Sequence, residues 1–124
     1  MDQSDWQLVR RTPLFGVLPR DVADRLIEGQ GARVYEKGIM LFQQGTAAEH
    51  CYFVLDGWVK VFRSSPDGHE TVVHVFRAGE IFGEAVIFMG GRYPVSAKAA
   101  TTCRLLKISG SRLRDCISET PGLA

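Results

Sequence analysis

The sequence lacks a long hydrophobic run, an excess of charge of either sign and a cysteine framework. No apolar stretch in its 124 residues approaches the ~20 that a membrane-spanning helix needs. The polar, acidic residues 1–6 do not resemble a secretory signal. The formal net charge of +1 gives no electrostatic signature of nucleic-acid binding. The three cysteines are odd in number and far apart, which favours a reducing, cytoplasmic environment without a membrane partner.

Residue patterns that mark metal and catalytic sites are also missing. Residues 1–50 contain no cysteine, which excludes an N-terminal cysteine cluster for iron and sulfur. There is no His-x-His pair of the kind that β-roll metal enzymes use. No Ser/His/Asp or Cys/His set has a supporting context either. We therefore expect neither an enzyme nor a metal site.

Short strands separated by glycines dominate residues 32–108. At this length the chain is expected to be one domain with a single core. Turn signals recur roughly every ten residues, which is typical of a sandwich or roll of short strands. The fold class is therefore mainly β, with about eight strands. The glycines that punctuate them are Gly38, Gly45, Gly57, Gly68, Gly79, Gly83 and Gly90.

Two hairpins and three helices are predicted. Asp56-Gly57 is expected to join strands 51–55 and 58–63 as a hairpin, and Pro66-Asp67-Gly68 to join strands 58–63 and 70–76. Residues 101–108 form the last strand. Helices are expected over residues 5–11, over 20–28 after Pro19, and from a serine cap near residue 110 to residue 117.

Residues 79–100 carry the features of a ligand site. The stretch predicts a strand end, a tight turn at Gly83, a short helix from Glu84 to Met89, a loop and a strand. The first turn of a helix exposes unpaired N–H groups that attract anions. With Glu84 and Arg92 close by, the segment could hold a small anionic ligand, or it could be a glycine-rich turn alone.

This segment resembles the phosphate-binding cassette of cyclic-nucleotide-binding domains. The wider chain, over about residues 10–118, resembles the effector domain of the CRP/FNR family of bacterial transcription regulators. The resemblance implies a double-stranded β-helix, similar to a jelly roll, with short flanking helices over residues 1–124. It also implies that a dimerisation helix and a helix-turn-helix domain follow, so that the full-length protein is a homodimer that binds DNA through that further part. The matching motifs include Phe42-Gln43-Gln44-Gly45, residues 52–61 and Pro66-Asp67-Gly68.

The resemblance also indicates ligand-binding residues. In cyclic-nucleotide binders the glutamate at the position of Glu84 accepts a hydrogen bond from the ribose 2′-hydroxyl. The family then carries an arginine, followed by Ser, Thr or Ala, that pairs with the phosphate. Here Tyr93 and Pro94 occupy those positions, which argues against cAMP or cGMP as the effector. The candidate ligand-binding residues are Gly83, Glu84, Ala85, Arg92, Tyr93 and Ser96.

A branch of the family lacks the same arginine. The apolar cassette and the Tyr93-Pro94-Val95-Ser96 run resemble the dissimilatory nitrate respiration regulators, which are haem-dependent sensors of nitric oxide. The resemblance implies haem as a cofactor, with His74 or His50 as the candidate iron ligand. Two alternatives stay open: a cAMP- or cGMP-binding domain, and a β-roll interaction module without a small ligand.

Overall fold

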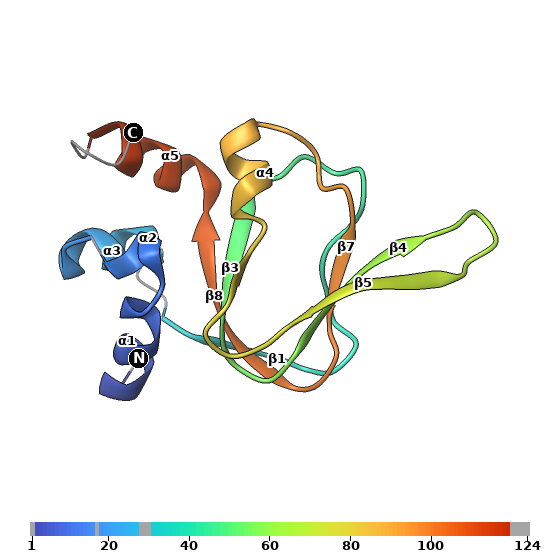
Figure 1. The fold of residues 1–124 in the computed structure, drawn as a ribbon, viewed down its shortest axis with the longest axis horizontal. Coiled ribbons are helices and arrows are strands. Elements are labelled where there is room, and N and C mark those ends of the chain that lie inside the picture. Colours follow the sequence, from blue (N-terminus) through green and yellow to red (C-terminus); the bar gives the residue numbers. More distant parts are fainter. Residues whose placement is uncertain (1, 17, 28–30, 120–124) are drawn as a thin grey trace.

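The computed structural model describes residues 2–16, 18–27 and 31–119, which form eight strands and five helices (Figure 1). None of the helices in these ranges is long and apolar enough to cross a membrane. The predicted mainly β roll with short helices is confirmed. The helices are α1 (Gln3–Arg10), α2 (Pro13–Gly16), α3 (Arg20–Leu26), α4 (Glu84–Met89) and α5 (Gly110–Glu119). The strands are β1 (Arg33–Tyr35), β2 (Met40–Phe42), β3 (His50–Asp56), β4 (Val59–Ser64), β5 (Glu70–Phe76), β6 (Ile81–Phe82), β7 (Ser96–Ala99) and β8 (Cys103–Ser109).

The strands form two antiparallel four-stranded sheets. One sheet has the order β1-β8-β3-β6 and the other β2-β7-β4-β5. Figure 1 shows α1, α2, α3 and α5 on one side, while the β4–β5 hairpin projects from the other. That hairpin pairs Ser64 with Glu70 and turns at Gly68, as predicted.

The predicted hairpin at Asp56-Gly57 is wrong. β3 pairs with β6 and β8, whereas β4 pairs with β5 and β7 in the other sheet. The turn at Gly57 therefore carries the chain from one sheet to the other. An Asp-Gly pair satisfies the backbone of a tight turn, but it does not decide whether the two strands pair with each other.

The helix predictions are confirmed in position but not in every boundary. The first helix spans Gln3–Arg10, and Pro13 begins a further short helix, α2, where its missing N–H is tolerated. Pro19 lies at the N-cap of α3, and the predicted end of that helix at residue 28 lies outside the described residues. The Ser109 hydroxyl accepts from the Arg112 N–H at 3.4 Å, at the start of α5.

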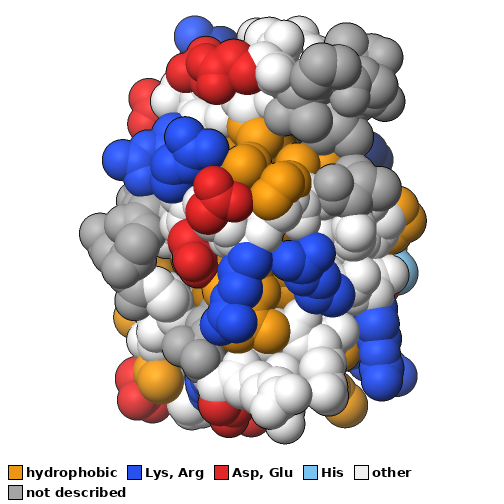
Figure 2. Space-filling view, turned by 90° about the vertical axis from the view of Figure 1, so that its left-hand side faces the viewer, with side chains coloured by type: hydrophobic (Ala, Val, Ile, Leu, Met, Phe, Trp, Pro, Cys, Tyr) orange, Lys and Arg blue, Asp and Glu red, His pale blue; other side chains and the backbone are white. Residues whose placement is uncertain are grey.

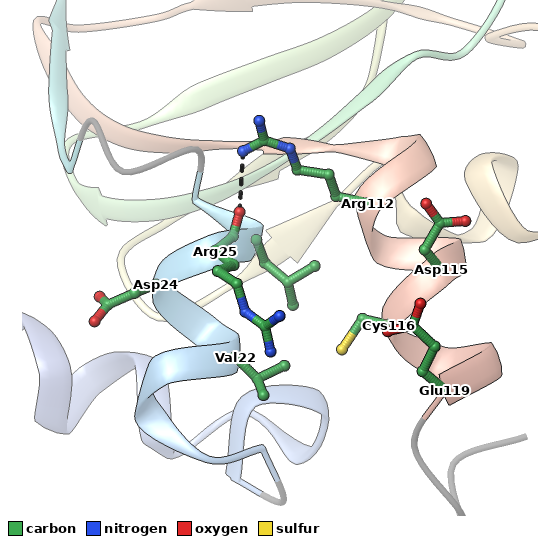
Figure 3. Close-up of a pocket in the computed structure, with 8 residues that line it drawn as sticks. Val22, Asp24, Arg25, Arg112, Asp115, Cys116 and Glu119 are labelled. Atoms are coloured by element: carbon green, nitrogen blue, oxygen red, sulfur yellow. Dashed lines mark hydrogen bonds between the residues drawn. The ribbon is translucent and has the colours of Figure 1, made fainter.

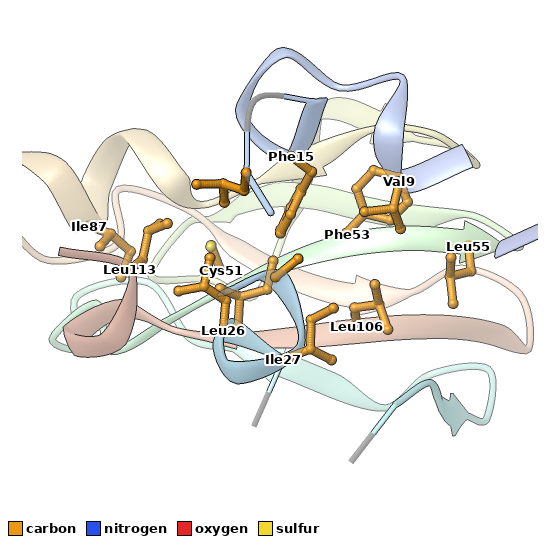
Figure 4. Close-up of a cluster of buried hydrophobic side chains, with 13 residues drawn as sticks. Val9, Phe15, Leu26, Ile27, Cys51, Phe53, Leu55, Ile87, Leu106 and Leu113 are labelled. Carbon is orange, nitrogen blue, oxygen red and sulfur yellow. The ribbon is translucent and has the colours of Figure 1, made fainter. Parts of the chain in front are cut away.

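Two apolar clusters hold the fold together because β3 and β8 are buried on both faces. One face of these strands packs against the helices, with Phe53, Leu106 and Leu113 among the fully buried side chains (Figure 4). The other face lines the space between the two sheets, where Val54 and Leu105 are fully buried. The second cluster lies behind the cassette and shapes the site described next.

An ion pair ties the first helix to the helix-covered sheet. Asp5 is only 7% exposed and accepts two hydrogen bonds from the Arg104 guanidinium of β8, at 2.8 and 3.3 Å. The Arg104 hydrogen bond lowers the pKa of Asp5 below its ordinary value. This pair links α1 to a strand that is distant in sequence.

Candidate functional site

The predicted order of elements in the cassette is confirmed. β6 ends at Phe82, and Gly83 follows with a φ of 87°, a left-handed conformation that a side chain would disfavour. The short helix α4 then runs to Met89 and ends at Gly90, whose φ is 66°. Ala85, on its first turn, is exposed.

Glu84 is half-buried on the first turn of α4. The Oε2 atom is buried without a hydrogen-bond partner among the described residues. Burial raises the pKa of this carboxyl, because desolvation disfavours its charged form. A ligand hydroxyl could satisfy this acceptor, as the resemblance to nucleotide binders implied.

Glu84→Gln is expected to stabilise the domain at neutral pH, by about 1 kcal/mol, because it removes a desolvated charge. Since the folded-state pKa of Glu84 lies above its ordinary value of 4.5, the carboxylate destabilises the fold as the pH rises through that value. Well below pH 4.5 the Glu84 carboxyl is protonated in both the folded and the unfolded state. The stability difference between Glu84→Gln and the unmodified domain should therefore disappear there. Urea unfolding at a series of pH values measures it, and a variant that is less stable at neutral pH would show that Glu84 has a partner.

Tyr93 is locked in place and only 5% exposed. Its ring stacks on Phe42, with centroids 3.8 Å apart and planes 8° apart. Its hydroxyl donates to the His50 carbonyl oxygen and accepts from the His50 N–H at 3.2 Å. The loop is held as well, because the Tyr93 N–H donates to the Thr46 carbonyl at 2.9 Å. The side chain at the position of the family's arginine is therefore neutral and fully engaged.

The side chains of Arg92 and Ser96 both form hydrogen bonds with the loop around residues 44–45. Arg92 is exposed, and its guanidinium donates to the Gly45 carbonyl at 2.9 Å. Ser96 is 3% exposed, and its hydroxyl accepts from the Gln44 N–H at 2.9 Å. Both side chains therefore hold the loop around residues 44–45.

Aromatic rings fill the space between the sheets behind the cassette. Phe82 stacks on Tyr52 and on Phe76, with centroids 5.5 and 5.0 Å apart, and lies 6.1 Å from Phe42. Together with Tyr93, these rings come from five different segments. Their spacing in the sequence follows neither a helical nor a strand period, so the sequence alone does not identify them as walls of the site.

The two candidate haem ligands lie in different places. His74 is exposed on β5 of the projecting hairpin, with its ring edge against Phe76 at 4.5 Å. His50, at the start of β3, is partly buried and borders a hollow of about 310 Å³, which we call the mouth hollow. It is lined by nine residues, which are Leu41, Phe42, Thr46, Ala47, Glu49, His50, Tyr52, Tyr93 and Lys107. Its volume is near the lower limit for small-molecule pockets, so it does not enclose a porphyrin.

A larger groove of about 720 Å³ lies between α3 and α5 (Figure 3). Val22, Leu26 and Cys116 form its apolar part, and the Arg112 guanidinium donates to the Arg25 carbonyl at 3.1 Å. Acidic and basic side chains are interspersed on this face of the molecule (Figure 2). The groove belongs to the helix-covered side and is separate from the cassette.

Comparisons with known proteins agree with this geometry. The sequence profile described as cyclic nucleotide-binding domain matches residues 32–120. The chain is 29% identical over 90 residues to the CRP-like cAMP-activated global transcriptional regulator of Mycobacterium tuberculosis, covering 73% of this chain and 40% of that protein. It is 28% identical over 120 residues to the cyclic nucleotide-gated potassium channel mll3241 of Mesorhizobium japonicum, covering 97% of this chain and 32% of the channel. The chain thus spans less than half the length of these curated relatives.

Solved structures give the same result. The sensor domain of the transcriptional regulator DNR from Pseudomonas aeruginosa superimposes with a TM-score of 0.84 at 27% identity, covering 94% of this chain and 79% of the other. A regulatory protein of Silicibacter pomeroyi, provisionally assigned as cAMP-binding, superimposes with a TM-score of 0.83 at 37% identity, covering 98% and 56%. The relatives named here are regulators and a channel.

Proposed function

Because this chain belongs to the cyclic nucleotide-binding domain family, we propose that it is the effector-sensing domain of a CRP/FNR-type transcription regulator whose effector is not a cyclic nucleotide. The likeness to CRP-like regulators and to the DNR sensor domain supports the regulator class. The single observation that carries the choice of effector is Tyr93, which occupies the position of the phosphate-binding arginine. In this proposal, DNA binding and dimerisation belong to a part of the protein beyond residue 124.

The chemistry of the cassette favours a ligand without a phosphate. A cyclic phosphate requires a cation, and the forked guanidinium of an arginine suits it best. The Tyr93 hydroxyl is neutral and already bonded to His50, and Arg92 is bonded to Gly45. An unpaired phosphate in a partly buried site costs several kcal/mol. The unpartnered Glu84 oxygen would oppose an anion further.

Contacts at the start of α5 would carry a signal out of the site. The Gly110 N–H donates to the Glu49 carbonyl at 2.8 Å, next to His50. The Arg114 guanidinium donates to the Ile87 carbonyl of α4 at 3.1 Å. An effector that favours one arrangement of α4 and β3 would therefore bias the position of α5. Only a difference in affinity between two arrangements can shift that balance.

We expect cAMP and cGMP to bind the unmodified domain with a Kd above ~0.1 mM, a binding free energy of only about −5 kcal/mol. Exchanging Tyr93-Pro94 for Arg-Ser should strengthen cAMP binding, because it supplies the missing cation. Isothermal calorimetry measures both affinities.

The matched control is Arg92→Gln, which should leave the weak affinity of the unmodified domain unchanged, because Arg92 faces solvent. Circular dichroism establishes whether the double variant folds. The cAMP affinity of the unmodified domain tests the proposal even if the double variant does not fold. Micromolar cAMP affinity in the unmodified domain would contradict the proposal and favour the alternative of a genuine cyclic-nucleotide-binding domain.

Haem stays a prediction of the resemblance to the nitric-oxide-sensing branch. Two observations weigh against haem: His74 is exposed, and the hollow beside His50, at about 310 Å³, is small for a porphyrin. Titrating the domain with haem and recording its absorption tests the prediction. The unmodified domain is compared with the variants His50→Ala and His74→Ala. A Soret band that depends on either histidine would favour haem as the effector.

A further inference from the structure

The mouth hollow brings together groups that are far apart in the sequence. Three aromatic rings, those of Phe42, Tyr52 and Tyr93, form its apolar walls. Glu49 and Lys107 supply one charge of each sign. Tyr93 is the cassette residue that lines it, whereas none of the residues Gly83 to Met89, Glu84 among them, does.

Lys107 faces the inside of the roll because of strand alternation. On β8, Cys103 and Leu105 are buried between the sheets, whereas Leu106 and Ile108 face the helices. Lys107 therefore shares the inner face with Cys103 and Leu105.

Lys107 also lies beyond the end of the neighbouring strand. β1 pairs with β8 only as far as Leu105, so Lys107 is paired with Tyr52 on one side and has no strand of the described chain on the other. Among the described residues, no hydrogen bond or ion pair engages its ammonium group. A lysine on the inner face of a roll, with no ion pair to any residue that the structure describes, can pair with an anionic ligand.

We propose that the mouth hollow binds a small planar carboxylate through Lys107. The ammonium group would pair with the carboxylate, and the rings of Phe42, Tyr52 and Tyr93 would contact the planar body. Glu49 disfavours a second negative charge and could accept a hydrogen bond from a donor on the ligand. The volume of about 310 Å³ suits a ligand of one ring.

Such a ligand would lie against the most constrained part of the site. The Tyr93 hydroxyl accepts a hydrogen bond from the His50 N–H and donates one to the His50 carbonyl. The adjacent Glu49 carbonyl accepts a hydrogen bond from Gly110, the first residue of α5. Occupancy of the hollow would therefore be detected at the backbone of His50. This binding does not depend on whether the cassette takes a cyclic nucleotide.

The test uses benzoate as the probe and benzamide as its neutral isostere, and binding to the 124-residue chain is followed by ¹H–¹⁵N NMR. We expect saturable benzoate binding below about 10 mM, with a shift of the His50 amide, and at least about tenfold weaker binding of benzamide. Lys107→Met should weaken benzoate binding by about tenfold or more. Lys37→Met, which removes a lysine from an exposed turn, should leave it unchanged.

Three results would overturn the inference. They are no saturation by benzoate at about 10 mM, equal affinities for benzoate and benzamide, and an unchanged benzoate affinity in the folded Lys107→Met variant. The comparison of benzoate with benzamide needs no variant, so it stands even if Lys107→Met fails to fold. Benzoate binding and cAMP binding are measured in separate titrations, so either result can fail without the other.

Discussion

Replacing Phe82 by alanine is expected to lower the free energy of unfolding by about 3–5 kcal/mol, the range for truncating a buried phenylalanine. Phe82 is 3% exposed and lies among the rings of Phe42, Tyr52 and Phe76. Its removal leaves a cavity that rigid aromatic neighbours on three different strands cannot easily fill. Chemical denaturation followed by circular dichroism measures the change.

Phe88→Ala is the matched control for this prediction. Phe88 lies on α4, a few residues after Phe82, but it is 48% exposed. The same truncation there should change stability by less than about 1 kcal/mol, because much of the side chain is already in water. If Phe82→Ala were as mild as Phe88→Ala, the ring cluster between the sheets would not be part of the stabilising core.

The sequence predicts the elements of this fold better than their partners. Glycine spacing and apolar alternation locate the β-rich region, and the Pro66-Asp67-Gly68 turn predicts the β4–β5 hairpin correctly. The segment from Gly83 to Met89 is correctly predicted as a turn and a short helix, because its residue types fix the local backbone. These features depend on interactions over a few residues.

Most of the site depends on contacts between distant residues. Tyr93 stands out in the sequence as a departure from the family pattern. The hydrogen bond from its hydroxyl to the His50 carbonyl, however, joins positions 43 residues apart. Lys107 gives no signal in the sequence, since a lysine in an amphipathic strand usually faces water. Its position follows from the start of β1 at Arg33, opposite Leu105, which only the pairing of the sheet reveals.

Gly57→Ala is expected to destabilise the domain by about 2–5 kcal/mol, for two separable reasons. The φ of Gly57 is 85°, and a residue with a side chain pays about 1–2 kcal/mol in the left-handed region. A Cβ atom at this position would also lie 2.6 Å from the Thr102 carbonyl oxygen and 2.8 Å from Cys103 Cα. These are backbone atoms of the chain that leads into β8, so they cannot move aside as a flexible side chain would. Overpacking of this kind typically adds about 1–3 kcal/mol.

Gly68→Ala separates the two contributions. Gly68 has a φ of 88°, almost the same as that of Gly57, but nothing lies within 4 Å of the position that a Cβ atom would take there. Its substitution should therefore show the conformational penalty alone, and urea unfolding of both variants gives the cost of the close approach as the difference. Equal losses at the two positions would mean that the crossing at Gly57 can relax away from Cys103. A larger loss at Gly57 follows from the architecture, because the β4–β5 hairpin turn projects into solvent, whereas the chain crossing between the sheets passes directly against the start of β8.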